Sequence, residues 1–401
     1  MSFKYFFNKI KDVKFADYME FIPMIIAILI YPLKKRNYAN SWLICEDPYE
    51  ARDNGYHFFK YMVKEHPEIK CYYAIKRKSI DREKVAKLGT IIEYGSIKHW
   101  LIYFSCKYNI SSQKGGKPNA AICSFMELNN IFKTKNIFLQ HGVTINNPSW
   151  LHHDKCRFYR FVTSAIPEYK FILREFGYAK EVLMLTGMPR FDALHDANTN
   201  KKRIVIMPTW RVWFNLKSKR KDNLNCKFIS SNYLLGWKKL LENEKLKSLI
   251  LNYNLEVIFY PHRNMQIYLK EMRQRINTDV IIASAEDYDI QDLLKTSVLM
   301  ITDYSSVFFD MIYQKKPVVF YQFDKNDFRM GQYDKGYFDY ENNDFAECYE
   351  NDSLVVNALE KFIKNEFACS DKFLEAYEYY FPFSDSKNSE RIYNSLKLES
   401  D

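Results

Sequence analysis

The sequence predicts an α/β protein made of two Rossmann-like, parallel-sheet domains that face each other across a cleft. Three observations support this prediction. Short apolar runs rich in β-branched and aromatic residues alternate with helix-length segments, as in doubly wound parallel sheets. The alternation occurs twice, on either side of a polar stretch at residues 195–203. A chain of 401 residues also has room for two domains.

The first predicted domain covers residues 41–195 and follows a distinct segment at residues 1–40. A helix is expected at residues 167–176, because Pro167 lies near its start and Gly177 directly follows its end. Another helix is expected at residues 52–65. The expected strands, in order, are 41–45, 72–76, 90–94, 109–112, 137–140 and 181–185.

The second predicted domain covers residues 196–401 and begins after a polar linker. A helix is expected at residues 289–296. Residues beyond about 357 form a helical tail that we expect to cross back to the first domain. The expected strands are 204–207, 256–260, 279–283, 298–302 and 317–321.

The N-terminal segment combines positive charge with a short apolar run. Residues 1–36 contain seven Lys and Arg against three Asp and Glu, which gives 7 − 3 = +4. The apolar run at residues 21–31 has 11 residues, too few to cross a bilayer, which takes about 20. Three interpretations remain open: an anchor in the membrane interface, an element packed on the catalytic domains, or an oligomerisation element.

Composition restricts the class of function. The net charge of +10 suits anionic partners, but no nucleic-acid-binding motif accompanies it. The eight cysteines contain no C-x-x-C pair, which argues against a zinc site and fits a reducing compartment. The chain lacks the G-x-G-x-x-G and Walker patterns, so NAD binding and P-loop ATP hydrolysis are disfavoured.

The strand expected at residues 298–302 ends in a small polar turn that contains Asp303, Ser305 and Ser306. A helix is expected to begin at Ser305 or Ser306. Unpaired N–H groups at a helix start attract phosphate, and ligands of parallel sheets bind at the carboxyl ends of strands. An ordinary helix cap is the simpler interpretation of this turn taken alone.

Two histidines follow other predicted strand ends. His141 stands before Gly142, which permits a sharp turn or the close approach of a ligand. His262 follows Pro261, a residue that cannot continue a central strand, and precedes Arg263. A single histidine in such a place is more often structural, but two of them together with the serine-rich turn predict a functional site.

The chain resembles the CDP-glycerol:poly(glycerophosphate) glycerophosphotransferases, the teichoic acid polymerase and primase family. The resemblance extends from about Trp42 to about Asp339. It rests on seven motifs in the family's order: Asp53–Gly55, Gln140–Gly142, Thr186–Asp192, Met207–Arg211, Pro261–Arg263, Thr302–Ser306, and Lys316–Tyr321 with Asp324. The resemblance implies a glycosyltransferase-B-like fold and transfer of a polyol phosphate from a CDP-activated donor.

The resemblance also implies roles for individual residues. His141 is the expected catalytic base and His262 the second catalytic histidine, which holds the donor pyrophosphate. Arg263, by contrast, is assigned to that pyrophosphate from its position alone, and a surface arginine is an equal alternative. The remaining candidates fall into two groups: Asp303, Ser305, Ser306, Thr209 and Arg211 on the donor phosphate or nucleotide, and Asp53, Asn54 and Gly142 on the acceptor side. Helix capping is at least as good an account of Asp53 and Asn54, and Asp303 has the alternative of orienting its turn.

The expected donor is CDP-glycerol, with no tightly bound cofactor. No residues are assigned to a metal, and whether a divalent metal takes part is left open. The expected partners are a lipid-linked glycan or poly(polyol phosphate) acceptor and the cytoplasmic face of the cell membrane, with no nucleic acid. The alternatives are a CDP-ribitol-dependent transferase, a nucleotide-sugar glycosyltransferase of the same fold, and a non-enzymatic assembly scaffold.

Overall fold

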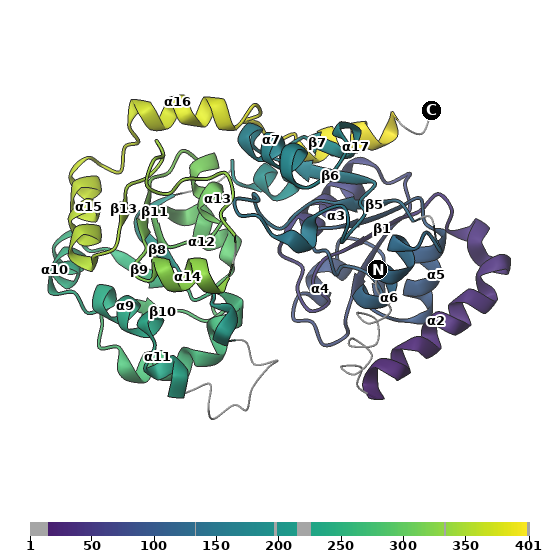
Figure 1. The fold of residues 1–401 in the computed structure, drawn as a ribbon, viewed down its shortest axis with the longest axis horizontal. Helices are drawn as coiled ribbons and strands as arrows, with labels where there is room; N and C mark the ends of the chain where they lie inside the picture. Colours follow the sequence, from purple (N-terminus) through teal and green to yellow (C-terminus); the bar gives the residue numbers. More distant parts are fainter. Residues whose placement is uncertain (1–14, 133, 196–198, 215–225, 333, 399–401) are drawn as a thin grey trace.

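The computed structural model describes residues 15–132, 134–195, 199–214, 226–332 and 334–398. Two separate sheets form the centres of two α/β domains, which lie side by side in Figure 1. Every strand pair in both sheets is parallel, so the predicted fold class is confirmed.

The first sheet has seven strands in the order β3-β2-β1-β4-β5-β6-β7. The strands are β1 Trp42–Cys45, β2 Cys71–Ile75, β3 Ile91–Glu93, β4 Tyr108–Ser111, β5 Asn136–Phe138, β6 Arg160–Thr163 and β7 Leu183–Leu185. The helices of this domain are α3 Asn54–Glu65, α4 Arg82–Ala86, α5 Ile97–Ser105, α6 Ala120–Leu128 and α7 Ile166–Glu175. Short 3-10 helices lie at η2 Ser149–Leu151, η3 Lys180–Val182 and η4 Pro189–Ala193.

The second sheet has six strands in the order β10-β9-β8-β11-β12-β13. The strands are β8 Asn200–Met207, β9 Glu256–Phe259, β10 Ile281–Ile282, β11 Ser297–Thr302, β12 Val318–Tyr321 and β13 Cys348–Tyr349. The helices are α9 Asn232–Leu241, α10 Glu244–Tyr253, α11 Leu269–Arg275, α12 Ile290–Thr296, α13 Phe308–Tyr313, α14 Lys325–Gly331 and α15 Asp352–Lys364. The 3-10 helices here are η5 Val212–Phe214 and η7 Arg263–Tyr268.

Side chains of the second sheet alternate between two hydrophobic layers. On β8, Ile204 and Ile206 pack into one buried layer, while Val205 and Met207 pack into the other. The second of these layers continues into the first domain, where Val143 and Ile145 are buried in the same cluster. The loop that follows His141 is therefore packed into the core of the C-terminal domain.

The end of the chain returns to the first domain, as expected for the helical tail. Helix α16 (Asp371–Tyr380) lies over the C-terminal domain and contacts α7 of the N-terminal domain, and α17 (Asn388–Lys397) lies on the N-terminal domain in Figure 1. Ile392 and Leu396 of α17 are buried beside Trp42 of β1. This packing ties the two domains together at a second place.

Helix α2 (Phe15–Lys34), followed by η1 (Lys35–Asn37), lies along the outer edge of the N-terminal domain, away from the C-terminal domain (Figure 1). Ala27 is fully buried against α5, and Met24 and Tyr31 pack on the same cluster. Ile25, Leu29 and Leu33 remain exposed on the opposite side. None of the described helices is long and apolar enough to cross a membrane. Residues 1–14 of the predicted N-terminal segment lie outside the described residues.

Three predicted boundaries need correction. Strand β8 begins at Asn200, inside the expected linker, because backbone pairing with β11 does not require apolar side chains. The expected strand at 279–283 is reduced to Ile281–Ile282, which pairs only with β9 at the edge of the sheet. Helix α13 begins at Phe308, so Ser305 and Ser306 precede it in a turn.

Candidate functional site

The predicted site residues gather where loops leave the carboxyl ends of central strands. His141 follows β5, Thr209 follows β8, His262 follows β9 and Asp303 follows β11. In the second sheet, β8 and β11 are the neighbours between which the strand order reverses. Ligands of open parallel sheets bind at such points, so the topology brings the predicted residues to the expected edge.

The backbone before His141 adopts an unusual conformation. Gln140 has a φ of 61°, in the left-handed region that non-glycine residues rarely adopt. Its side chain holds this turn, with Nε2 donating to the carbonyl of Val162 (2.6 Å) and to Glu168 Oε1 (3.0 Å). Its Oε1 accepts from the Thr144 hydroxyl at 2.5 Å. A strained backbone that the surroundings fix this firmly is characteristic of functional loops.

Glu168 is a fully buried carboxyl group that ties the His141 loop to the next strand end. Its Oε1 accepts from the backbone N–H of Thr144 at 2.6 Å, and its Oε2 accepts from the backbone N–H of Ser164 at 2.8 Å. Burial raises the pKa of Glu168 to about 7 despite these donors. The role of Glu168 could not be predicted from the sequence, because a glutamate in the first turn of a helix is common.

Arg190 connects the His141 loop with both domains. The side chain is only 3% exposed. It forms a two-bond ion pair with Asp310 of α13 (2.7 and 2.8 Å), while its Nη1 donates to Asp53 Oδ1 (2.8 Å) and to the backbone carbonyl of His141 (2.6 Å). A guanidinium group suits this task because it offers five donors in a fixed plane.

Asn54 supports the same arrangement from the start of α3. Its Oδ1 accepts from the backbone N–H of Arg190 at 3.0 Å, and its Nδ2 donates to the backbone carbonyl of Gln140 at 2.8 Å. Asn54 is fully buried, and Asp53 is engaged with Arg190. The side chains of Asp53 and Asn54 position Arg190 and the turn before His141, and their contact with the acceptor stays a prediction.

Gly142 and Ser306 bring the two domains into direct contact. A β-carbon placed on Gly142 would lie 2.8 Å from the Ser306 hydroxyl oxygen, too close for a real contact. The same β-carbon would lie 3.8 Å from Nη2 of Arg190. Gly142 therefore lets the Ser306 hydroxyl group lie against the His141 loop, and its place on the acceptor side stays a prediction.

The turn after β11 presents donors beside this contact. The backbone N–H groups of Ser305 and Ser306 make no hydrogen bond to any residue that the structure describes. The Ser305 hydroxyl accepts from the backbone N–H of Val307 at 3.4 Å. Because α13 has six residues and begins at Phe308, these free N–H groups belong to the turn rather than to a long helix start.

Arg211 and Asp303 are fully buried and pair with other groups of the protein, and their contact with the donor stays a prediction. Arg211 donates to Asp303 at 2.8 Å and to both oxygens of Asp324 at 2.9 Å. Asp303 accepts from the backbone N–H groups of Thr209 and Tyr304, both at 2.7 Å. The network fixes the turns after β8 and β11 relative to each other, the alternative left open for Asp303.

Thr209 differs from its two charged neighbours. Its hydroxyl oxygen is buried and has no hydrogen-bond partner among the described residues. Its backbone is held by Asp303, so the position of the hydroxyl group is fixed at the carboxyl end of β8. Thr209 thus remains a candidate for contact with the donor.

His262 has a defined neutral form. Its Nδ1 is 3.1 Å from the backbone N–H of Asn264 and accepts from it, so the neutral ring carries its proton on Nε2. Desolvation, followed by the charges of Arg263 and His141, lowers the pKa of His262 to about 4. At neutral pH the ring is therefore an uncharged N–H donor.

Arg263 turns toward the first domain. Its Nη1 contacts Asp47 at 3.0 Å and Glu50 at 3.1 Å, both in the loop after β1. The side chain is 48% exposed. Asp47 and Glu50 engage only Nη1 of Arg263, so the contact of Arg263 with the pyrophosphate stays a prediction.

His141 is the least constrained polar side chain of the site. Its ring nitrogens make no hydrogen bond with the described part of the chain, whereas its backbone carbonyl is fixed by Arg190. The surrounding protein lowers the pKa of His141 through desolvation; Asp53 opposes the shift and Arg190 adds to it. The ring is neutral at neutral pH and able to accept a proton.

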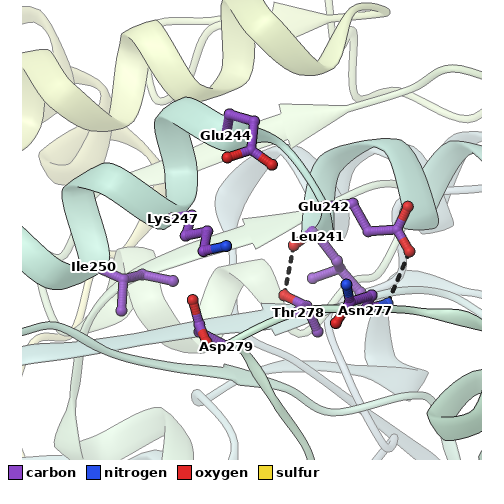
Figure 2. Close-up of a pocket in the computed structure, with 8 residues that line it drawn as sticks. All are labelled: Leu241, Glu242, Glu244, Lys247, Ile250, Asn277, Thr278 and Asp279. Carbon is purple, nitrogen blue, oxygen red and sulfur yellow. Dashed lines mark hydrogen bonds between the residues drawn. The ribbon is translucent and has the colours of Figure 1, made fainter.

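No group of three or more metal-ligating side chains suited to hold a metal occurs among the described residues. A depression of about 220 Å³ lies among the residues drawn in Figure 2. Its wall includes Leu241, where α9 ends, Lys247 of α10 and Asp279, which precedes β10. These residues lie at the amino ends of the strands, the edge opposite the site.

Comparison with known proteins gives the chain its family. Residues 30–398 match the family described as CDP-Glycerol:Poly(glycerophosphate) glycerophosphotransferase. The minor teichoic acid biosynthesis protein GgaB of Bacillus subtilis (strain 168) is 32% identical over 361 residues, covering 88% of this chain and 39% of that protein. The teichoic acid poly(glycerol phosphate) polymerase of Bacillus spizizenii is 31% identical over 170 residues, 37% of each chain. This chain thus spans about two fifths of the length of these curated relatives.

Solved structures agree with the fold. A structure of the wall teichoic acid polymerase TagF superimposes with a TM-score of 0.68 at 15% identity, covering 97% of this chain and 100% of the other. A putative UDP-N-acetylglucosamine 2-epimerase from Listeria monocytogenes superimposes with a TM-score of 0.56 at 13% identity, covering 90% and 98%. The glycosyltransferase-B-like architecture and the predicted family are both confirmed, and this chain belongs to the CDP-glycerol:poly(glycerophosphate) glycerophosphotransferase family.

Proposed function

We propose that this chain transfers glycerol phosphate from CDP-glycerol to a hydroxyl group of a lipid-linked or polymeric acceptor and releases CMP. The family supports the reaction class, and relatives in teichoic acid synthesis support the kind of product. The observation that carries the proposal is the meeting of the His141–Gly142 loop with Ser306, which comes from the other domain.

His141 acts as the general base in this proposal. Its neutral ring takes the proton of the acceptor hydroxyl group while the acceptor oxygen forms a bond to the β-phosphorus of CDP-glycerol. The bond between that phosphorus and the oxygen bridging to the CMP phosphate breaks, and CMP leaves with the bonding electrons. The fixed carbonyl of His141 keeps the base in place while its ring stays free.

The donor phosphates are held by neutral N–H and O–H groups. His262 donates from Nε2, because its Nδ1 is engaged by Asn264. The free backbone N–H groups of Ser305 and Ser306, with the Ser306 and Thr209 hydroxyl groups, supply further donors toward the phosphate oxygens. Preorganised donors of this kind stabilise the charge that develops on a transferring phosphoryl group. No divalent metal is assigned.

CDP-ribitol is the alternative donor, and a specific observation keeps it open. The ribitol-phosphate polymerase TarK of Staphylococcus aureus is 24% identical over 247 residues, 56% of this chain and 42% of that protein. The test is CMP release from CDP-glycerol and from CDP-ribitol, each with a lipid-linked acceptor. Release from one donor would identify the polyol, and release from neither would refute the proposal.

We further propose that the protein works at the cytoplasmic face of the cell membrane through α2. The inner side of this helix packs on α5, so its exposed side chains face away from the domain. Leu29 is 71% exposed and Leu33 is 81% exposed, next to Lys34, Lys35 and Arg36. Such a stripe beside basic residues suits the interface of an anionic bilayer.

A further inference from the structure

A second pocket lies between the two domains at the carboxyl edges of the sheets. Its volume is about 240 Å³. One wall is the loop that continues from His141, and the other is the end of α14 and the segment after it, which follow β12. Its principal lining residues are Asn147, Ser149, Trp150, Arg329, Gln332 and Asp334. The volume is below the roughly 300–1,000 Å³ of pockets that enclose a whole small molecule, so it suits a segment of a longer one.

The pocket carries polar donors without a permanent acidic partner. Arg329 donates to the side-chain oxygen of Asn146 at 3.2 Å and forms no ion pair with the carboxylates that the structure describes. Gln332 accepts from the backbone N–H of Val212 through Oε1, but its Nε2 is buried without a partner among the described residues. An unsatisfied amide donor beside a half-buried arginine favours a ligand with anionic or hydroxyl oxygens.

Trp150 adds an aromatic surface to the same pocket. The side chain is 39% exposed. The ammonium group of Lys114 lies 5.7 Å from its ring centroid and donates to its backbone carbonyl at 2.6 Å. A rigid indole next to cationic groups offers a surface for the C–H faces of a sugar or polyol and a positive field for its phosphates.

One short loop of the chain connects the pocket to His141. Asn147 is six residues after His141, so fully extended chain limits their separation to about 20 Å. The backbone N–H of Asn147 donates to the carbonyl of Asp334 at 3.2 Å, which joins the two walls. An extended ligand that fills the pocket can therefore reach the histidine with its end.

We propose that this pocket binds the acceptor, through a phosphate-bearing polyol or sugar segment that lies a short distance from the hydroxyl group under attack. The assignment rests on the proposed transferase function, since it names where the second substrate of that reaction is held. Arg329 binds a phosphate oxygen of the acceptor. The Nε2 group of Gln332 donates to a hydroxyl or phosphate oxygen, and Trp150 packs against the carbon backbone of the acceptor.

The test compares Michaelis constants for the two substrates in the full-length protein. Arg329→Gln and Trp150→Ala are assayed by CMP release with CDP-glycerol (or CDP-ribitol, where that is the donor) and a synthetic oligo(glycerol phosphate) acceptor. Lys247→Gln, which removes a charge from the pocket at the opposite edge, is the matched control. We expect the acceptor KM to rise about tenfold in each pocket variant, as for loss of one charge-assisted contact, with the donor KM within twofold of wild type.

An unchanged acceptor KM in Arg329→Gln and in Trp150→Ala would overturn the proposal. Should Trp150→Ala fail to fold, judged by its thermal midpoint, Arg329→Gln decides alone, because its side chain is half-buried and remains polar. Failure of the transferase proposal has a different signature: the wild-type protein would release no CMP from either CDP-polyol.

Discussion

The hydroxyl oxygen of Ser306 lies 2.8 Å from the point where a β-carbon on Gly142 would stand. These residues belong to different domains and are separated by more than 160 positions in the sequence. Their contact joins the loop that carries His141 to the turn that carries the free N–H groups of Ser305 and Ser306. The site is therefore assembled only when both domains are in place.

We expect Gly142→Ala to reduce kcat severalfold, since the added methyl group must displace the Ser306 hydroxyl group from its place beside the His141 loop. Adding Ser306→Ala removes the oxygen that clashes and leaves an ordinary contact at 3.6 Å to the Ser306 β-carbon. The double variant should be more active than the sum of the single effects predicts. Strictly additive losses in a double-mutant cycle would contradict this contact.

The charges around His141 predict opposite shifts in the pH profile of kcat/KM. Asp53 raises the pKa of His141 and Arg190 lowers it. Because a general base works only when neutral, the acidic limb follows this pKa. Asp53→Asn should move the limb to lower pH, and Arg190→Gln should move it to higher pH. If the acidic limb moves in the same direction in both variants, or moves in neither, His141 is not the group that titrates.

The buried Arg211 network predicts a loss of stability. Asp324→Asn removes one of the two carboxylates that pair with buried Arg211 and leaves Asp303 as its partner, so we expect it to lower the free energy of unfolding by about 1–3 kcal/mol. Chemical denaturation measures this loss. Lys364→Gln, which breaks an exposed ion pair with Glu360, is the control and should leave the transition unchanged. If Asp324→Asn instead weakened donor binding at full stability, Arg211 and Asp303 would belong to the donor site.

The exposed face of α2 predicts salt-sensitive binding to anionic lipid. Leu29→Asp and Leu33→Asp place charge on that face without touching the residues packed on α5. Co-sedimentation with vesicles of phosphatidylglycerol should fall in the double variant. Ala27→Ser, on the buried side, controls for damage to the packing. Equal co-sedimentation of wild type and the Leu29, Leu33 variant would leave α2 as a packing element only.

Much of the fold could be predicted from the sequence, because parallel strands are short apolar runs and each run here ends at a turn. The sequence predicts the bounds of an element less well where backbone hydrogen bonds, rather than side chains, determine them. Residues Asn200–Arg203 are polar, yet they extend β8 through backbone pairing. The start of α13 was placed too early because Ser305 and Ser306 resemble a helix cap but form a separate turn.

The sequence predicts where the candidate site lies better than it predicts the role of each residue. The strand-end histidines and the serine turn lie where the motifs indicated. Arg190 belongs to the Thr186–Asp192 motif. Its role could not be predicted, because its partners His141 and Asp310 lie 49 and 120 residues away in the sequence. Sequence pattern does not report burial for single polar residues, so the support that Arg211, Asp303 and Asn54 give to the turns could not be predicted.

The central claim is that His141 is the general base of a site that both domains complete. The most direct measurement compares wild type and His141→Ala in two assays: steady-state CMP release with a saturating acceptor, and calorimetric binding of CDP-glycerol (or of CDP-ribitol, where that is the donor). The account predicts a loss of about 10²–10⁴ in kcat with donor affinity within about threefold of wild type. Retained turnover, or donor affinity lost together with kcat, would contradict it.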